Sequence, residues 1–292
     1  DFSPEQQQNL LAIVWLHRDQ IDKYLDLVSG YCRRTLDEGA GCFKAENDNG
    51  DSIRPLPHFL AALKTLIETL EAFTDTLSPD AGHTTVQTEL AEALSVFRGD
   101  VAEFQKALAE QEDAWQKQKT ANGALKEAVD RLAPTAETSR NLVKQSDLLY
   151  KLVTRLIETC EQECGTKESD AWNGREITRL RKAADEVRQL AISQLKQVRY
   201  FWKQARWLTE RFPEAKLCDV EGLVKLVDRS EIKANDWSLT PGRYVGVAPE
   251  EEDENFDFEE ALREIHVELE DLNAEAVTLA ATIRKNFEEL GV

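Results

Sequence analysis

The amino-acid sequence predicts an all-α protein: an elongated bundle of long antiparallel helices, followed by a C-terminal coiled-coil helix. Three observations predict this class. Apolar residues recur at helical spacing through most of the 292 residues. The composition, with 41% hydrophobic and 31% charged residues, favours long amphipathic helices over a thick globule. In the last segment the apolar spacing shifts to a mean step of about 3.5 residues, which is typical of helices that wind around a partner.

Residues 1–37 are predicted to form the first helix. Ser3 is placed as its N-cap, Pro4 occupies the first helical position, and Gln6 can reach back to the cap. An apolar stripe at helical spacing then continues to the end of the segment. Residues 38–55 contain three glycines and a polar run, so we expect a loop there.

Residues 56–165 are predicted to form an array of antiparallel helical hairpins. Pro57 opens the first helix of this array. The next helix begins near Thr84 and is expected to continue to Leu132. Pro134 is expected to end it and to open the last helix of the array, because a proline removes a hydrogen bond from a helix interior.

A long helix is predicted for residues 175–212. At 1.5 Å per residue it is about 55 Å long. Its last third interleaves aromatic with basic side chains: Tyr200, Phe201, Trp202 and Trp207 with Arg199, Lys203, Arg206 and Arg211. Such a pattern is typical of a nucleic-acid surface with stacking platforms, and equally of a core stripe covered by Arg and Lys stems. We favour the core stripe, and expect any DNA contact to go to phosphates through Arg199, Lys203 and Arg206.

The charge distribution restricts contact with nucleic acid to this region. The chain has a formal net charge of −19. Residues 1–174 hold 18 Lys and Arg against 30 Asp and Glu, whereas residues 175–233 hold 14 against 9. Because an acidic surface repels the phosphate backbone, any DNA contact is expected to be local and confined to residues 175–211.

Residues 213–255 are predicted to contain short helices, a rigid loop and an acidic linker. The Pro-Gly pair in the loop is typical of a type II turn, since Pro fixes φ at one central residue and Gly permits a positive φ at the next. Two aromatic residues flank the turn as expected packing anchors. The loop residues are Trp237, Pro241, Gly242, Arg243, Tyr244 and Gly246. Taken alone, such a loop is more often structural than functional.

Residues 256–292 are predicted to be the coiled-coil helix and the main partner-binding element. From Phe258 the apolar positions step alternately by four and three residues. The partner-binding seam consists of Leu262, Ile265, Leu269, Leu272, Leu279 and Ile283. Burying each of these side chains is worth about 1.5 to 3 kcal/mol before ordering costs, so the seam is sufficient to drive association.

Parts of this sequence resemble the modification subunit of type I restriction-modification systems, which are adenine-specific DNA methyltransferases. The similarity to the C-terminal region of that subunit lies in Asp219-Val220-Glu221-Gly222-Leu223, in Trp237-Ser238-Leu239-Thr240-Pro241-Gly242-Arg243-Tyr244-Val245-Gly246, and in the acidic linker, heptad helix and Leu290-Gly291 ending that follow. The first 36 residues also resemble the segment that follows the catalytic domain in long members. About half of the chain is covered by the resemblance.

The resemblance implies a set of partners. The C-terminal helix would dock on the specificity subunit, joining the helices between that subunit's two DNA-recognition domains. A second modification subunit and the restriction subunit would complete the assembly, and the chain would contact DNA mainly indirectly, because another subunit reads the target sequence. S-adenosylmethionine would be the cofactor of the catalytic domain.

The catalytic motifs of that family are missing from these residues. An adenine methyltransferase needs a Gly-rich loop for S-adenosylmethionine and an Asn-Pro-Pro-Phe or Asn-Pro-Pro-Tyr element for the flipped base, and the sequence contains neither. We therefore expect the catalytic domain to lie upstream of Asp1, and no catalytic, cofactor-binding or metal-binding residue within the chain. The five cysteines lack zinc spacing and are expected to be free thiols of a cytoplasmic protein. With no run of 18 apolar residues, no membrane partner is expected.

Two functions of different classes remain open. The first is a non-catalytic part of a methyltransferase subunit that docks on the specificity subunit. The second is a freestanding coiled-coil scaffold or self-associating adaptor. The Pro-Gly loop with its Trp and Tyr discriminates between them, because a plain scaffold does not need it.

Overall fold

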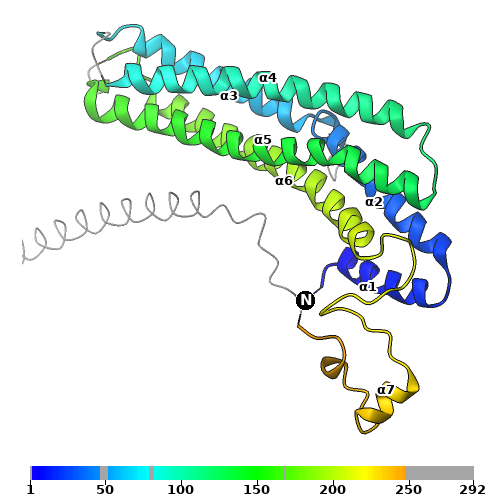
Figure 1. The fold of residues 1–292 in the computed structure, drawn as a ribbon. Coiled ribbons are helices and arrows are strands. Elements are labelled where there is room, and N and C mark those ends of the chain that lie inside the picture. Colours follow the sequence, from blue (N-terminus) through cyan, green and yellow to red (C-terminus); the bar gives the residue numbers. More distant parts are fainter. Residues whose placement is uncertain (1, 47–51, 79–81, 167–168, 248–292) are drawn as a thin grey trace, which may run out of the picture. The chain divides into compact units, whose positions relative to one another are not determined.

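The computed structural model describes residues 2–46, 52–78, 82–166 and 169–247. This part of the chain is built from α-helices, which confirms the all-α class (Figure 1). The helices are α1 (Pro4–His17), α2 (Ile21–Gly41), α3 (Pro55–Thr74), α4 (His83–Trp115), α5 (Asn122–Glu163), α6 (Gly174–Arg211) and α7 (Arg229–Ala234). The chain divides into two compact units, Asp1–Leu217 and Cys218–Val292. The predicted coiled-coil helix, residues 256–292, lies outside the described residues.

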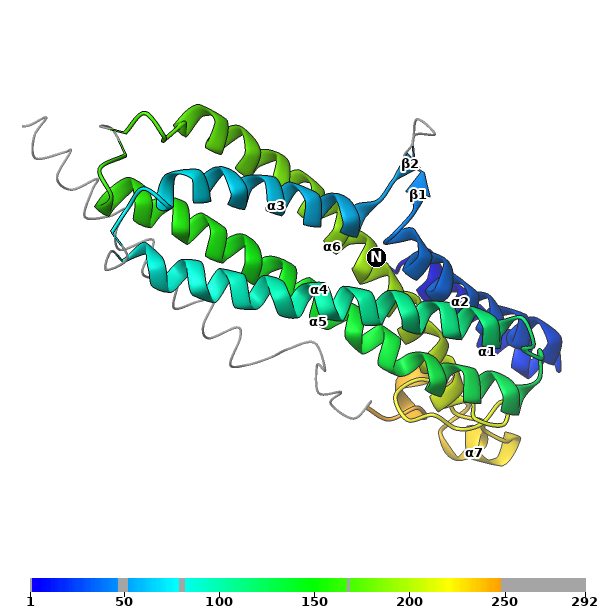
Figure 2. The ribbon, with the colours of Figure 1, turned by 90° about the horizontal axis from the view of Figure 1, so that it is seen from above.

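The first unit is a long helical bundle with α6 at its centre. Helix α6 packs against α2, α3 and α5, and α5 also packs against α4. Helices α2 and α3 follow one another along α6, and a two-stranded hairpin projects from the break between them (Figure 2). The apolar faces meet in a continuous core that includes Phe59, Leu66, Phe97, Phe104, Leu125, Leu195 and Phe212, each at most 2% exposed. The bundle therefore consists of α4, α5, α6 and a fourth helical layer made of α2 and α3.

The first predicted helix is in fact two helices. The N-cap prediction is confirmed, because Ser3 Oγ accepts the Gln6 N–H at 3.2 Å and Gln6 Oε1 accepts the Ser3 N–H at 2.9 Å. Helix α1 nevertheless ends at His17, and Asp19 adopts a left-handed φ of 55° before α2 begins. Asp tolerates this conformation better than most residues, which permits a sharp reversal within an otherwise helical apolar pattern.

The loop expected over residues 38–55 is shorter than predicted. Helix α2 continues to Gly41, and β1 (Ala45–Glu46) pairs antiparallel with β2 (Ser52–Ile53). Two of the glycines that suggested a loop are buried in the helix instead. A Cβ on Gly39 would lie 2.3 Å from Leu108 Cδ2, and one on Gly41 would lie 2.6 Å from Gln194 Nε2. These glycines therefore permit close packing of α4 and α6 on α2.

The helix break expected at Pro134 is also wrong. Helix α5 continues through Pro134, and the reversal between α4 and α5 occurs at residues 116–121. Side-chain hydrogen bonds stabilise that reversal, since Gln118 Nε2 donates to the Ala124 carbonyl at 2.9 Å and Arg131 Nη2 donates to Gln118 Oε1 at 3.1 Å. Tertiary packing along 42 residues of α5 outweighs the hydrogen bond that the proline removes.

Replacing Pro134 by Ala is expected to stabilise the protein by about 1 to 2 kcal/mol. The substitution restores an amide donor inside α5, and this gain is larger than the unfolded-state entropy that proline removes. Urea unfolding monitored by circular dichroism measures the change. Thr138→Ala, one turn later, is the control, and an equal or lower stability of Pro134→Ala would contradict the argument.

Candidate protein interface

Two of the four aromatic residues singled out in α6 belong to the bundle core. Phe201 and Trp202 are buried, and Trp202 Nε1 donates to the Val129 carbonyl at 2.9 Å. Trp207 is half-buried, and the Arg211 guanidinium lies over its ring at 4.5 Å. Tyr200 is half-buried, and its hydroxyl lies 2.7 Å from Ser3 Oγ and donates to Glu5 Oε2 at 2.9 Å. These rings hold α1 and α5 against α6, so they are not a stacking platform for bases.

The three basic residues of α6 that were expected to contact phosphates differ in burial and in their ion pairs. Arg199 is buried and its guanidinium donates to Glu137 Oε1 at 3.1 Å, so the phosphate contact expected for Arg199 is corrected to an ion pair inside the bundle. Arg206 lies over the Trp202 ring at 5.3 Å and bonds Glu210 at 2.6 Å. Lys203 is half-buried. Phosphate contact by Lys203 and Arg206 stays a prediction.

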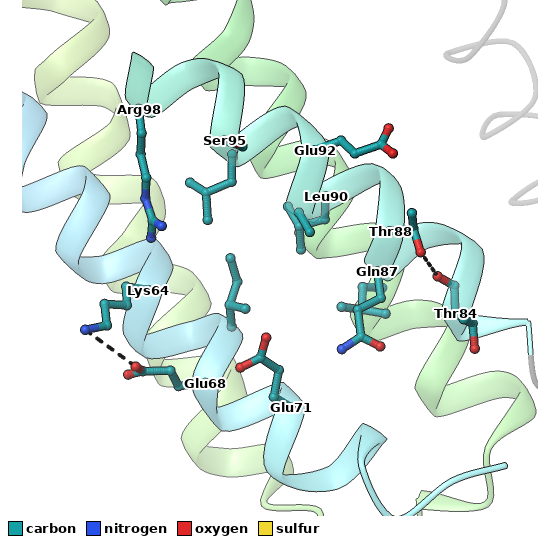
Figure 3. A pocket seen from close by; sticks show the side chains of 14 residues that line it. Lys64, Glu68, Glu71, Thr84, Gln87, Thr88, Leu90, Glu92, Ser95 and Arg98 are labelled. Carbon is teal, nitrogen blue, oxygen red and sulfur yellow. Dashed lines mark hydrogen bonds and ion pairs between the residues drawn. The ribbon is translucent and has the colours of Figure 1, made fainter. Parts of the chain in front are cut away.

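A groove of about 640 Å³ lies between α3 and α4 (Figure 3). Its apolar lining includes Leu90, Leu94 and Leu156, and its rim carries the Lys64–Glu68 ion pair at 3.6 Å. The residues that line it include no aromatic ring on which a base could stack.

The second unit is described as far as Val247 and is built from turns tied together by backbone and carboxylate hydrogen bonds. The Asp219 carboxylate accepts the Leu226 N–H at 2.8 Å and is paired with Lys225. Gly222, with a φ of 72° that favours glycine, donates its N–H to the Val245 carbonyl at 2.6 Å. The segment at Asp219 is thus fixed to the segment that follows the Pro-Gly pair.

The Pro-Gly pair does not form the predicted type II turn. Residues Pro241–Arg243 form a 3₁₀ helix, and Gly242 is absent from the residues with positive φ. The Arg243 N–H donates to the Thr240 carbonyl at 3.1 Å and the Tyr244 N–H donates to the Pro241 carbonyl at 2.9 Å. Two successive bonds of this kind require a helical φ at Gly242. The expected positive φ occurs instead at Gly246.

Trp237 is presented on an unusual backbone. Asp236 and Trp237 both have left-handed φ values, 55° and 59°, and a bulky side chain is rare in this region. The Trp237 N–H donates to the Ile232 carbonyl at 2.9 Å, and the Tyr244 hydroxyl donates to the Ser238 carbonyl. The expectation that Trp237 packs as an anchor is wrong, because its side chain is 56% exposed.

Exposed apolar side chains accumulate in this unit. They are Leu226 (48%), Trp237 (56%), Leu239 (77%) and Val247 (85%). Isolated exposed apolar residues are ordinary, but a strained and hydrogen-bonded turn that presents a Trp is typical of a binding surface. We name residues 226–247 the Trp237 loop. The described residues thus form a helical bundle and a second unit that presents these four apolar side chains to solvent.

Comparison with known proteins links the chain to restriction-modification. Over 73 residues it is 41% identical to the type I restriction enzyme HindI methylase subunit of Haemophilus influenzae. The match spans 25% of this chain and only 16% of that subunit. No protein-family model matches the chain, and no solved structure matches it. The similarity supports a restriction-modification related role.

Among the described residues, no group of three or more His, Cys, Asp or Glu side chains is arranged to hold a metal ion. None of the helices described is both long and apolar enough to cross a bilayer. The six seam residues, Leu262 to Ile283, lie outside the described part of the chain.

The ion pair at Asp219 predicts a pH dependence for the second unit. Its partner Lys225, together with the Leu226 N–H, holds the pKa of the Asp219 carboxyl below its ordinary value. A lowered pKa stabilises the folded unit above the unfolded pKa of Asp, and this stabilisation is lost as the pH falls through the lowered value. An NMR titration should show the Leu226 amide shift changing only at that lower pH. Lys225→Met should raise the midpoint, and an unchanged midpoint would contradict the assignment.

Trp237→Asn is expected to stabilise the loop by about 1 kcal/mol. Asn adopts left-handed φ more readily than Trp, and a side chain already 56% exposed loses little burial. Amide hydrogen exchange at Ser238 measures the change. Trp237→Val is the matched control, because a β-branched residue should destabilise the same turn. Faster exchange in Trp237→Asn would show that Trp237 is needed for folding.

Proposed function

We propose that this chain is a non-catalytic part of the modification subunit of a type I restriction-modification system, and that it docks on the specificity subunit. The observation that carries the proposal is the 41% identity over 73 residues with a type I methylase subunit. A helical bundle with an exposed Trp237 loop fits a docking role. In this proposal methylation and S-adenosylmethionine binding belong to another part of the subunit, and the specificity subunit makes most of the DNA contacts.

The docking is expected to use the seam of residues 256–292. Six apolar residues at heptad spacing require a partner helix, and helices that contribute such seams form bundles by interdigitating their side chains. The Trp237 loop precedes this segment in the chain. Trp and Arg are enriched among the residues that dominate binding energies, and Trp237 and Arg243 are both exposed.

Copurification with the specificity subunit tests the proposal. Leu269→Asp with Leu272→Asp should abolish the complex while leaving the helical signal of the bundle unchanged, because two buried charges break the seam. Val267→Asp with Ala274→Asp is the matched control, since it adds the same charge away from the seam. Unimpaired assembly of the variant with Leu269→Asp and Leu272→Asp would contradict the proposed docking through residues 256–292. Failure of the wild-type chain to bind would favour the scaffold function instead.

A further inference from the structure

Helix α6 carries an excess of positive charge on an acidic protein. Its 38 residues hold ten Lys and Arg against four Asp and Glu, whereas the whole chain has a formal net charge of −19. Three of the four acidic residues pair with arginines of the same helix, in Glu176–Arg179, Asp185–Arg188 and Glu210–Arg206. The carboxylates of α6 are therefore too few to neutralise its basic residues.

Four of these basic side chains form no ion pair or hydrogen bond with a residue that the structure describes. They are Arg175, Arg181, Lys182 and Lys196. Arg175, Lys182 and Lys196 are exposed and lie at intervals of 7 and 14 residues. A helix turns only about 20° out of line over each seven residues, so the three lie close to one line that is about 31 Å long. Their charges are available to a ligand.

Helix α5, which packs along α6, adds two lysines to this side of the bundle (Figure 1). Arg188 of α6 pairs with Asp147 of α5 and lies 4.7 Å from the centre of the Tyr150 ring. Lys144 and Lys151 lie three residues before and four residues after Asp147, so they share the side of α5 that is turned towards α6. We name six residues the α5–α6 basic surface: Lys144, Lys151, Arg175, Arg181, Lys182 and Lys196.

The chemistry of α5 and α6 fits phosphate groups better than a partner helix or an unpaired base. Leu148 on α5 and Leu190 on α6 are their exposed large apolar residues, and one such residue on each helix does not make a heptad seam. The aromatic rings of both helices are buried or half-buried, so they offer no platform on which bases could stack. Exposed Gln and Ser side chains between the cations add hydrogen-bonding groups that commonly contact phosphates: Gln189, Ser193 and Gln197.

We propose that the α5–α6 basic surface binds the phosphate backbone of double-stranded DNA without reading its bases. The line from Arg175 to Lys196 matches about nine base pairs, at about 3.4 Å for each base pair. Acidic residues on other faces of the protein weaken the contact little, because the Debye length is about 8 Å at physiological ionic strength. The surface uses neither the Trp237 loop nor residues 256–292, so this contact goes beyond the proposed docking on the specificity subunit.

Fluorescence anisotropy of a labelled DNA duplex, titrated with the full chain from about 50 to about 200 mM salt, tests the proposal. Lys182→Gln with Lys196→Gln should raise the Kd at least about tenfold at the lowest salt and reduce the slope of log affinity against log salt by about 1.8, because two phosphate contacts are lost. Lys64→Gln with Lys106→Gln is the matched control. It removes the same charge from α3 and α4, at side chains that are 63% and 79% exposed.

A loss of affinity and of salt slope in the Lys182 and Lys196 variant alone, with unchanged circular dichroism, supports the contact. Absence of binding at the lowest salt overturns it, and so does an equal loss in the Lys64 and Lys106 control. Tighter binding of a single strand of the same length would point to stacked bases, and tighter binding of polyglutamate would point to an acidic protein segment. Either result overturns the assignment to a duplex. Copurification with the specificity subunit is measured separately, so the two proposals fail independently.

Discussion

Burial of α6 is the interaction on which the rest of the bundle depends. One helix of 38 residues contacts α2, α3 and α5, and its buried face carries Ala184, Ala191 and Ala205 between larger side chains. Small residues on that face allow neighbouring backbones to approach, and Gly41 of α2 leaves room for Gln194 of α6. The two halves of the broken layer, α2 and α3, are aligned because both pack on this one continuous helix.

Most of the long helices were predictable from the sequence, because apolar periodicity over 20 or more residues is a strong local signal. The positions at which the helices end were not predictable in this way. Pro134 is a local helix breaker, yet packing along α5 retains the helix there, while the reversal at residues 116–121 lacks a proline. Gly39 and Gly41 suggested a loop because glycine is common in loops. The structure shows instead that a Cβ at these positions would clash with Leu108 and Gln194. Tertiary contacts determine these points, and no window of sequence contains them.

The same limit explains the candidate interface. From the sequence we singled out the loop of residues 237–246 but interpreted Trp237 as a packing anchor, because a Trp side chain is usually buried. Its exposure depends on the consecutive left-handed residues Asp236 and Trp237, and on the hydrogen bonds that retain them. Asn235 and Asp236 tolerate left-handed φ, and their presence in the sequence indicated a turn of this kind. The sequence did not indicate that the turn exposes the Trp237 side chain.

The Trp237 loop presents apolar side chains to solvent on an acidic protein. A net charge of −19 suppresses nonspecific association, so the proposed docking must draw on exposed apolar groups such as Trp237. The loop holds this aromatic ring on a strained turn, beside charged residues that include Asp236 and Arg243. Backbone strain at Trp237 lowers the stability of the free protein, and a partner that buries the ring compensates for that loss. A substitution that relieves the strain should therefore separate stability from binding. Trp237→Asn should increase the stability of the free protein and decrease its affinity for the partner.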